Sequence, residues 1–428
     1  MNCIGIDIGT TGICGISVDC SEGRILKKIS LDNDTFIKSD NDFERIQNVE
    51  AIFEKVSLAI ENLADEDTAG IGFSNQMHGI LYTDKNGSAV SPLYTWQDAR
   101  GGIEYKDKKS YAEYLGSFPG YGLVTDFYNR ENSLIPDGAE YLLTIGDYAV
   151  MKLCGKTSPL MHTSNAASLG LFDYQSMSFK IQNDLLPEIT DNYVPAGEYR
   201  GIPVIVSLGD NQASFLGSVR DNDSALINFG TGSQISVMTD SSLLPDCFEA
   251  RPLGNKRQIA AGCALCGGRA FRMAERFIAQ CAGIKDGTVP ESLYKQIDEL
   301  LQNKSETTML ADTRFCGTRK NPQIKGAFYN IDENNFTPQD MLLSVLDGMS
   351  RELYDMYAML ETGCKNLVCS GNGIRKNPAL QRIVSSMFDM PLLFPEYKEE
   401  AAYGAALCAM AGTGVYDDID SARQLIKY

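Results

Sequence analysis

One short phrase occurs twice in this chain, near its start and about halfway along. The first copy is Ile6-Asp7-Ile8-Gly9-Thr10-Thr11, and the second, 221 residues later, is Ile227-Asn228-Phe229-Gly230-Thr231-Gly232. Each copy lies between two alternating apolar runs, which predicts two β-hairpins with glycine-rich tips. The predicted strands are Cys3–Ile8 and Gly12–Val18 in the first hairpin, and Ala225–Phe229 and Gln234–Met238 in the second.

A glycine-rich tip of this kind is suited to binding an anion. It presents backbone N–H groups and threonine hydroxyls, and glycine allows the ligand to approach the backbone closely. A single such turn is more often structural, because short motifs have many chance matches. Two copies in register instead predict a duplicated phosphate-binding fold whose tips face each other across a cleft.

Length and composition predict a soluble protein of two domains. The chain has 428 residues, more than one core usually supports, and it is 43% apolar and 22% charged. We see no apolar stretch of membrane-spanning length and no secretory signal at the start of the chain. Most of the twelve cysteines lie in apolar patterns. This is expected of reduced thiols and indicates the cytoplasm. The absence of a membrane-spanning apolar stretch predicts no membrane partner.

The net charge and the spacing of metal-ligand residues argue against a nucleic-acid-binding protein and a zinc protein. The net charge of −18 argues against a nucleic-acid partner and favours a small neutral substrate, with any nucleotide arriving as its magnesium complex. Cys263-x-x-Cys266 has no second pair at zinc-ligand spacing, and the only histidines are His78 and His162. The pattern therefore does not favour a zinc site.

Strands alternate with helices, which predicts an α/β fold with ligands beyond the carboxyl ends of its strands. A helix is expected over Asn48–Leu63, and the strand Gly70–Phe73 then leads into the polar turn Ser74-Asn75-Gln76-Met77-His78-Gly79. The strand Pro92–Trp96 delivers Gln97 and Asp98. We interpret Trp96, the only tryptophan, as a core residue in preference to one that stacks on a ligand.

A further apolar strand, Pro203–Leu208, leads into Gly209-Asp210-Asn211-Gln212 and a helix of small residues. An Asp at a strand tip has the geometry of a general base, although Asp also caps helices well, and spacing alone leaves both readings open. The polar connector after this helix is the expected boundary between a domain over residues 1–219 and one over 220–428. The later Gly-rich turns Gly267-Gly268-Arg269 and Ser370-Gly371-Asn372-Gly373 open further helices.

These motifs together resemble the FGGY family of carbohydrate kinases over essentially the whole chain. The matching elements occur in the family's order: Gly5 to Thr11, Gln76 to Gly79, Trp96-Gln97-Asp98, Gly209-Asp210-Asn211, Gly230-Thr231-Gly232-Ser233, Ser370 to Gly373, and Glu400-Ala401-Ala402-Tyr403-Gly404-Ala405. The resemblance implies two actin-like ATPase (ribonuclease-H-like) domains with an interdomain cleft. It implies an ATP-dependent sugar kinase that uses Mg2+; homodimerisation is left open.

The resemblance also implies roles for individual residues. Asp210 is the expected catalytic base, and Asp7 the carboxylate that holds Mg2+ through water. The expected sugar ligands are Gln76, Met77, His78, Asp98, Asp210 and Asn211. The expected ATP ligands are Thr10, Thr11, Gly230, Thr231 and Gly232 for the phosphates, and Gly371, Asn372, Gly373 and Asn377 for the adenosine. The N-terminal domain would thus bind sugar and the C-terminal domain nucleotide.

Three stretches favour sedoheptulokinases within the family: Thr95 to Asp98, Leu160 to Ser168, and Leu265 to Phe271. Xylulokinases are the alternative, since they share Gln-Met-His-Gly but usually carry Trp-Asn-Asp. A non-catalytic actin-fold protein is a further alternative, because the family usually places a Lys or Arg shortly after the first Gly-Thr-Thr, and this chain has Gly12 and Cys14 there. Arg100, Arg269 and Lys376 are candidates for the missing cation.

Overall fold

A computed structural model describes residues 1–241, 243–284, 288–302, 304–319 and 321–428. The chain divides into two compact units. Unit 1 comprises Met1–Asp221, Arg251–Ile259 and Glu399–Ile426, and unit 2 comprises Asn222–Ala250, Ala260–Lys398 and Lys427–Tyr428. The predicted boundary after residue 219 lies close to the first crossing between the units. The division into 1–219 and 220–428 differs from the structure, however, because residues 251–259 and 399–426 pack with unit 1.

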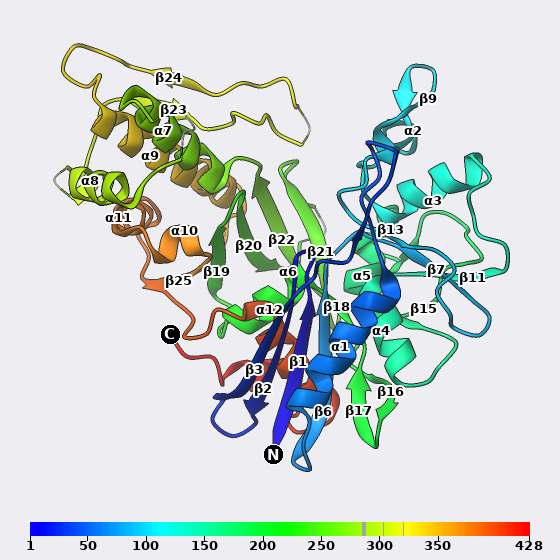
Figure 1. The fold of residues 1–428 in the computed structure, drawn as a ribbon. Coiled ribbons are helices and arrows are strands. Elements are labelled where there is room, and N and C mark those ends of the chain that lie inside the picture. Colours follow the sequence, from blue (N-terminus) through cyan, green and yellow to red (C-terminus); the bar gives the residue numbers. More distant parts are fainter. Residues whose placement is uncertain (242, 285–287, 303, 320) are drawn as a thin grey trace. The chain divides into compact units, whose positions relative to one another are not determined.

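Unit 1 is built around one mixed sheet with the strand order β16-β17-β6-β1-β2-β3, and β18 also pairs with β6 (Figure 1). The strands of unit 1, in this sheet and in smaller ones, are β1 (Asn2–Ile8), β2 (Gly12–Asp19), β3 (Ile25–Asp32), β4 (Phe36–Ile37), β5 (Ile46–Gln47), β6 (Thr68–Asn75), β7 (Leu81–Asp84), β8 (Leu93–Tyr94), β9 (Glu104–Lys106), β10 (Lys109–Ser110), β11 (Ala139–Leu143), β12 (Leu160–His162), β13 (Phe172–Asp173), β14 (Ser178–Phe179), β15 (Glu188–Thr190), β16 (Pro195–Tyr199), β17 (Ile202–Ile205) and β18 (Leu208–Gly209).

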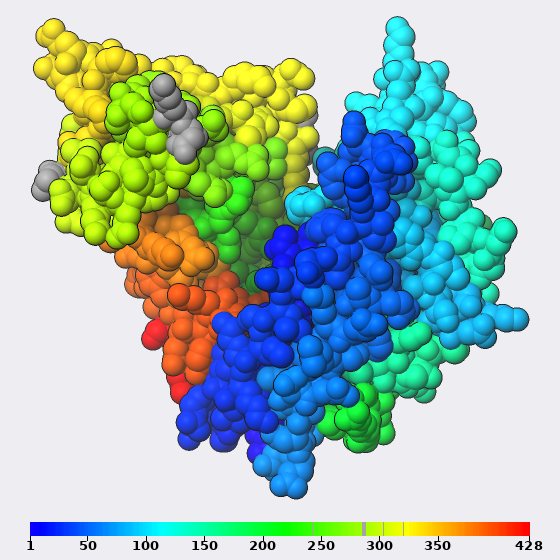
Figure 2. All heavy atoms as spheres, viewed as in Figure 1, coloured from blue at the N-terminus to red at the C-terminus, as the bar shows by residue number. Residues whose placement is uncertain are grey.

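The helices of unit 1 are α1 (Val49–Leu63), α2 (Tyr111–Leu115), α3 (Gly122–Glu131), α4 (Ile145–Leu153), α5 (Thr163–Ser168), α6 (Asp210–Ser218), α12 (Glu400–Gly412) and α13 (Ile419–Arg423), and Arg100–Gly102 forms a 3-10 turn. The hairpin of β9 and β10 projects from the rest of this unit as a cyan finger in Figures 1 and 2.

The two faces of β1 pack against different helices, because successive side chains on a strand point to opposite faces. Ile4, Ile6 and Ile8 join the core formed with α1. Gly5 faces the other way, and a Cβ on it would lie 1.8 Å from the carbonyl oxygen of Ala402 in α12. Its β6 neighbour Gly72 stands in the same relation to Ala405, at 1.9 Å. The paired glycines therefore let α12 lie directly on the sheet.

Helix α12 also packs closely on α6. A Cβ on Gly217 of α6 would lie 2.0 Å from the carbonyl oxygen of Glu400, and one on Gly404 of α12 would lie 1.9 Å from that of Ala213. The small residues of α12 thus serve close packing. Because α6 follows directly after β18, this contact holds the start of α6 at the carboxyl end of the sheet.

Unit 2 repeats the hairpin in a second sheet with the order β21-β22-β20-β19-β25-β26. The strands of unit 2 are β19 (Ser224–Phe229), β20 (Ser233–Thr239), β21 (Phe248–Gly254), β22 (Arg257–Ala264), β23 (Leu310–Asp312), β24 (Ala327–Tyr329), β25 (Asn366–Ser370) and β26 (Leu392–Leu393). The end of β21 and the start of β22, residues 251–259, belong to unit 1. The helices of unit 2 are α7 (Gly267–Cys281), α8 (Glu291–Gln302), α9 (Pro338–Ala358), α10 (Asn372–Arg375) and α11 (Pro378–Phe388).

The predicted duplication holds at the level of hydrogen bonds. In each unit the first strand is antiparallel to the second and parallel to a later one: β1 with β2 and β6, and β19 with β20 and β25. The tips match too. Gly9 N–H donates to the carbonyl of Gly12 at 2.9 Å, and Gly230 N–H donates to that of Gly232 at 2.9 Å. Within the described residues, no helix combines the length and apolar character needed to span a bilayer.

Candidate active site

Two carboxylates meet at the carboxyl edge of the unit 1 sheet. Strands β1, β6 and β18 are parallel there, with Asp7 beside Ser74 and Gly209 beside Asn75. Asp7 lies on the same face of β1 as Gly5, the face that α12 covers. Asp210 begins α6, which packs on α12. The register therefore brings the two predicted acidic residues to one place, with the Ser74 hydroxyl donating to Asp7 Oδ1 at 2.8 Å.

The surroundings keep Asp210 close to its titration midpoint at neutral pH. Burial raises the pKa of its carboxyl to about 7, the negative charge of Asp7 adds to the rise, and Arg251 and the backbone N–H of Asn211 partly offset it. Burial likewise raises the pKa of Asp7, against the lowering effect of the Ser74 hydroxyl. A carboxylate with a pKa near 7 suits general base catalysis at physiological pH.

The N-cap of α6 is Gly209, and Asp210 is the first helical residue. The alternative interpretation of Asp210 as the N-cap is therefore wrong. Polar atoms that follow it in the sequence lack partners: Asn211 Oδ1 and both amide atoms of Gln212 are buried, with no hydrogen bond in the described part of the chain. Buried polar atoms are normally satisfied, so these are suited to a ligand or ordered water. Sequence reasoning did not select Gln212.

The first Gly-Thr turn is tied to the polar turn after β6. Thr10 Oγ1 donates to Gln76 Oε1 at 3.0 Å, and Gln76 Nε2 donates to Gln47 Oε1 at 2.9 Å. Gln47 Nε2 closes the ring by donating to the carbonyl of Thr10 at 3.0 Å. The structure thus joins two predicted residues, Thr10 and Gln76, both directly and through Gln47. Sequence reasoning missed Gln47, which gives no signal of its own on the short strand β5.

Trp96 extends this set from the solvent side. Its Nε1 donates to Thr10 Oγ1 at 3.0 Å, and its side chain is 47% exposed. The interpretation of Trp96 as a core residue is therefore wrong. An exposed indole held beside the first Gly-Thr turn offers a flat apolar surface.

Met77 and His78 continue from Gln76. Met77 is buried, and a Cβ on Gly209 would lie 3.0 Å from its Cγ, which places it beside the start of α6. His78 has a φ of 72° and stacks on Tyr121, with the ring centroids 4.3 Å apart. Its Nδ1 lies 2.6 Å from the carbonyl oxygen of Ser168, so Nδ1 is the donor. In the neutral ring, Nε2 is then a hydrogen-bond acceptor.

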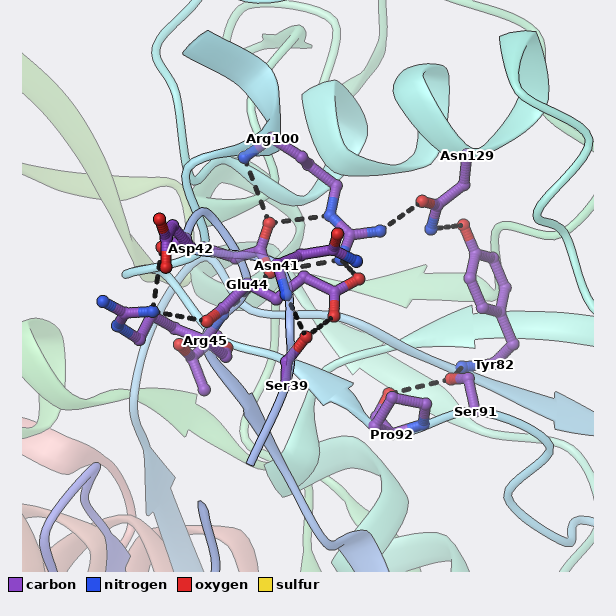
Figure 3. A network of polar contacts seen from close by, with 12 residues as sticks. Ser39, Asn41, Asp42, Glu44, Arg45, Tyr82, Ser91, Pro92, Arg100 and Asn129 are labelled. Carbon is purple, nitrogen blue, oxygen red and sulfur yellow. Dashed lines mark hydrogen bonds and ion pairs between the residues drawn. The ribbon is translucent and has the colours of Figure 1, made fainter. Parts of the chain in front are cut away.

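Asp98 belongs to a buried ion-pair network around Arg100, which Figure 3 shows beside Asn129. Its Oδ1 accepts from Arg100 Nε at 2.7 Å, and its Oδ2 accepts from Arg100 Nη2 at 3.2 Å and from the backbone N–H of Arg45 at 3.1 Å. Arg100 Nη1 also donates to Asn129 Oδ1 at 2.6 Å. These contacts give Asp98 a structural role, and sugar binding by Asp98 stays a prediction.

The arginines predicted to replace the missing cation differ in burial and in contacts. Arg100 is only 1% exposed, which removes it from consideration. Arg269 Nη1 donates to Cys316 Sγ at 3.4 Å. Arg272, which sequence reasoning missed, contacts the second Gly-Thr turn: its Nη2 donates to Thr231 Oγ1 at 3.4 Å. Its position one turn of α7 beyond Gly268 was the available signal.

Helix α7 holds the second Gly-Thr turn in place. The backbone N–H groups of Gly268 and Arg269 donate to the carbonyls of Gly230 at 2.9 Å and Thr231 at 3.1 Å. Gly230 and Thr231 are exposed. The turn is therefore fixed from α7 while Gly230 and Thr231 stay exposed.

The predicted adenosine residues lie beside this turn for reasons of packing. A Cβ on Gly371 or Gly373 would lie 2.7 Å or 2.6 Å from the carbonyl oxygen of Phe229, and Gly371 has a φ of 85°. Asn372 is exposed at the start of α10. Asn377 caps α11, because its Oδ1 accepts from the N–H of Leu380 at 3.0 Å. Contact of this segment with adenosine stays a prediction.

Known proteins resemble this chain over most of its length. The model for the N-terminal domain of the FGGY family of carbohydrate kinases matches residues 2–115, and that for the C-terminal domain matches residues 225–413. The chain is 26% identical to mouse sedoheptulokinase over 417 residues, covering 85% of this chain and 86% of that protein. It is 24% identical to the xylulose kinase of Staphylococcus xylosus, covering 96% and 90%.

Among solved structures, xylulose kinase from Rhodospirillum rubrum superposes with a TM-score of 0.85 at 18% identity, covering 100% of this chain and 93% of that one. The fold is thus the α/β actin-like ATPase fold that the motifs predicted.

Proposed function

This chain belongs to the FGGY family of carbohydrate kinases and is an ATP-dependent sugar kinase, and we propose that it phosphorylates a ketose, sedoheptulose in the first place, on its terminal primary hydroxyl. Similarity to mouse sedoheptulokinase at 26% identity supports this substrate. D-xylulose is the second candidate, supported by similarity to the xylulose kinase of Staphylococcus xylosus at 24% identity. We place the reaction in the cytoplasm, where ATP is available and where thiols stay reduced.

The observation that carries the proposed chemistry is the environment of Asp210. Its carboxyl, with a pKa raised to about 7, lies at the carboxyl edge of the sheet, next to Asn211 Oδ1 and the Gln212 amide, which lack hydrogen bonds among the described residues. In our proposal Asp210 accepts the proton of the sugar hydroxyl as the hydroxyl oxygen attacks the γ-phosphorus of ATP and ADP departs. Asn211 and Gln212 bind neighbouring hydroxyls, which satisfies their buried atoms.

Gln76, Met77 and His78 complete the proposed sugar-binding set. Gln76 is oriented by Thr10 and Gln47, and His78 by Ser168 and Tyr121. Because these side chains are fixed before the sugar arrives, less conformational entropy is lost on binding. A pocket for a polyol needs such oriented donors and acceptors, since every buried hydroxyl must find a partner.

We propose that the two Gly-Thr turns bind the phosphate groups of ATP, through Thr10 and Thr11 in unit 1 and Gly230, Thr231 and Gly232 in unit 2. The cation that this chain lacks after Thr11 is then supplied by Arg272, which contacts Thr231. Nucleotide binding by Gly371, Asn372, Gly373 and Asn377 is part of the same proposal.

Asp7 fits the residue that would hold Mg2+. Burial raises the pKa of Asp210, and the negative charge of Asp7 raises it further, so a divalent cation beside the two carboxylates would offset their repulsion. Hard cations prefer carboxylate oxygens and water. When bound, Mg2+ would neutralise charge on the transferring phosphoryl group. Ser74 orients Asp7 for this role by binding its Oδ1.

The test is ADP release from MgATP against sedoheptulose, D-xylulose, D-ribulose, L-fuculose and glycerol. We expect the highest kcat/KM with sedoheptulose. Asp210→Asn should lower kcat by about 10²–10⁴-fold, the usual contribution of a general base. Asp221→Asn, a carboxylate beyond the end of α6, is the matched control and should retain activity. A preference for D-xylulose would select the second candidate, whereas full activity of Asp210→Asn would remove Asp210 from the mechanism.

A further inference from the structure

Two cysteines that are far apart in the sequence lie together in unit 2. Cys266 directly precedes α7, and Cys316 lies in the loop between β23 and β24. Their Sγ atoms are 3.6 Å apart, across 50 residues of sequence. All twelve cysteines of the chain are free thiols in the structure. The thiol that adjoins Cys266 is therefore that of Cys316, whereas Cys263, its neighbour in the sequence, donates to Gln234 Oε1 at 3.4 Å.

The two thiols differ in exposure and in charge environment. Cys266 is 1% exposed, and burial, together with the neighbouring Cys316 sulfur, raises its pKa to about 12. Cys316 is partly exposed, and Arg269 Nη1 donates to its sulfur at 3.4 Å. That guanidinium lowers the pKa of Cys316. Because the thiolate is the nucleophilic form, Cys316 is the thiol that reacts first with an oxidant, and Cys266 is placed to react with the product.

The pair is connected to the second Gly-Thr turn through the start of α7. Cys266 is the N-cap residue of this helix, and the N–H groups of Gly268 and Arg269 donate to the carbonyls of Gly230 and Thr231. The start of α7 packs tightly against this turn, because a Cβ on Gly267 would lie 2.1 Å from Ser233 Oγ and 2.5 Å from the carbonyl carbon of Gly232. A displacement of Cys266 must therefore be transmitted to the turn.

We propose that Cys266 and Cys316 form a reversible disulfide when the protein meets a peroxide, and that this cross-link weakens nucleotide binding. The Cys316 thiolate attacks a peroxide oxygen, giving a sulfenic acid and releasing water after protonation. The Cys266 thiol then displaces the sulfenic oxygen as a second water, and the S–S bond forms. Cys316 and Cys266 are oxidised and the peroxide is reduced. A dithiol reductant reverses the change by thiol–disulfide exchange.

The cross-link should disturb the turn because the sulfurs must approach further. A disulfide bond is about 2.05 Å long, so the two Sγ atoms close by about 1.5 Å from their present separation. Part of that movement draws the N-cap of α7 away from Gly230 and Thr231. Oxidation also removes the thiolate that Arg269 contacts. The part of the proposal that concerns nucleotide rests on the proposed kinase function, while formation of the disulfide does not.

The chain contains a comparison pair. Cys3 and Cys20 have their sulfurs 3.8 Å apart, but both are buried, at 0% and 7% exposure. Sulfur separation is nearly the same in the two pairs, and access of the oxidant differs. We therefore expect Cys266–Cys316 to cross-link at peroxide levels that leave Cys3 and Cys20 reduced.

The first experiment maps the cross-link in the whole chain. The reduced protein is exposed to hydrogen peroxide, alkylated and digested with trypsin without reductant. Cleavage at arginine gives the peptides 258–269 and 315–319, and we expect them joined, with two hydrogens fewer than their sum. Because Cys263 lies in the first peptide, the digest is repeated on Cys263→Ser, which should cross-link as before. Cys316→Ser should not, and a link that is lost in Cys263→Ser would overturn the assignment.

Two rates and one affinity complete the test. Arg269→Gln should slow cross-linking roughly tenfold at pH 7, since a neighbouring cation commonly lowers a thiol pKa by about one or more. Arg276→Gln, on the same helix, should leave the rate unchanged. A fluorescent ATP analogue should bind the oxidised protein severalfold more weakly than the reduced one, with recovery after dithiothreitol and no change in Cys316→Ser. Equal affinity of the cross-linked and reduced forms would refute the link to the turn, whether or not a sugar substrate has been found.

Discussion

Replacing Asp210 by Asn should make the protein more stable while it removes catalysis. The carboxyl of Asp210 is held in a setting that disfavours its charge, because burial and the charge of Asp7 both raise its pKa. Asn has the same shape as a protonated Asp and carries no charge. The substitution therefore removes the unfavourable ionisation without creating a cavity. Residues that serve function but lower stability in this way are common at active sites.

The size and sign of the effect follow from the two pKa values. The folded-state pKa of about 7 exceeds the ordinary value of 3.8, so the ionisable group binds its proton more tightly in the folded state. The free energy of unfolding is unaffected by this group below pH 3.8 and falls as the pH rises to about 7. Asn should thus stabilise the protein by about 1.5 kcal/mol at pH 5 and by at most about 4 kcal/mol at pH 8.

The assay uses the single tryptophan. Trp96 lies in unit 1, as does Asp210, so its fluorescence follows the unfolding of the unit that carries the substitution. Urea midpoints of the unmodified chain and Asp210→Asn would be compared at pH 5 and pH 8. Asp19→Asn is the control of opposite sign. Hydrogen bonds from Ser21 and Glu22 hold the pKa of Asp19 at about 2, so its removal should destabilise by the same amount at both pH values.

A stabilisation by Asp210→Asn that does not grow between pH 5 and pH 8 would show that Asp210 titrates near its ordinary value. The explanation of its role as a base poised near neutrality would then fail. A second check uses Asp7→Asn, which removes the neighbouring charge. The pKa of Asp210 should fall in that variant, and the pH dependence should move to lower pH.

Two further predictions concern arginines. Arg272→Gln should raise the KM for ATP severalfold with little change in kcat, and Arg272→Lys should restore most of the affinity, because a phosphate needs the charge; equal KM values in all three proteins would contradict the role of Arg272. Arg100→Gln should destabilise unit 1 by about 3–5 kcal/mol, since it leaves the Asp98 carboxylate buried without its partner. Urea unfolding followed by Trp96 measures this, and a loss below about 1 kcal/mol would mean that the ion pair contributes little.

The strands, the turns and the positions of the acidic residues could be predicted from the sequence because they follow from local pattern. The runs that flank both Gly-Thr turns alternate with a period of two, and the observed strands β1, β2, β19 and β20 match the predicted ones to within about two residues. Parallel pairing then places Asp7 and Asp210 at one sheet edge without further information.

The partners of individual side chains could not be predicted, because they depend on residues distant in the sequence. Asp98 matches a family motif, yet its carboxylate is bound by the Arg100 side chain and by the backbone N–H of Arg45. Trp96 is predicted to lie in the core, but its Nε1 donates to the Thr10 hydroxyl and its side chain is exposed. Gln47 gives no local signal, and only the fold reveals that it connects Gln76 to Thr10.

Several unfavourable features of unit 1 lie together at the carboxyl edge of its sheet. The pKa of the Asp210 carboxyl is raised by burial, Asn211 and Gln212 have buried polar atoms without hydrogen bonds in the described part of the chain, and His78 adopts a left-handed backbone conformation. Folded chains normally avoid each of these, and their concentration at one place is typical of a binding site. A sugar that supplies the missing hydrogen bonds would relieve part of this cost only in the folded state. Sugar binding should therefore raise the stability of unit 1, by an amount set by its concentration relative to Kd. The stabilisation should be largest for the sugar whose hydroxyls reach both Asn211 and Gln212, so the urea midpoint ranks substrates without turnover.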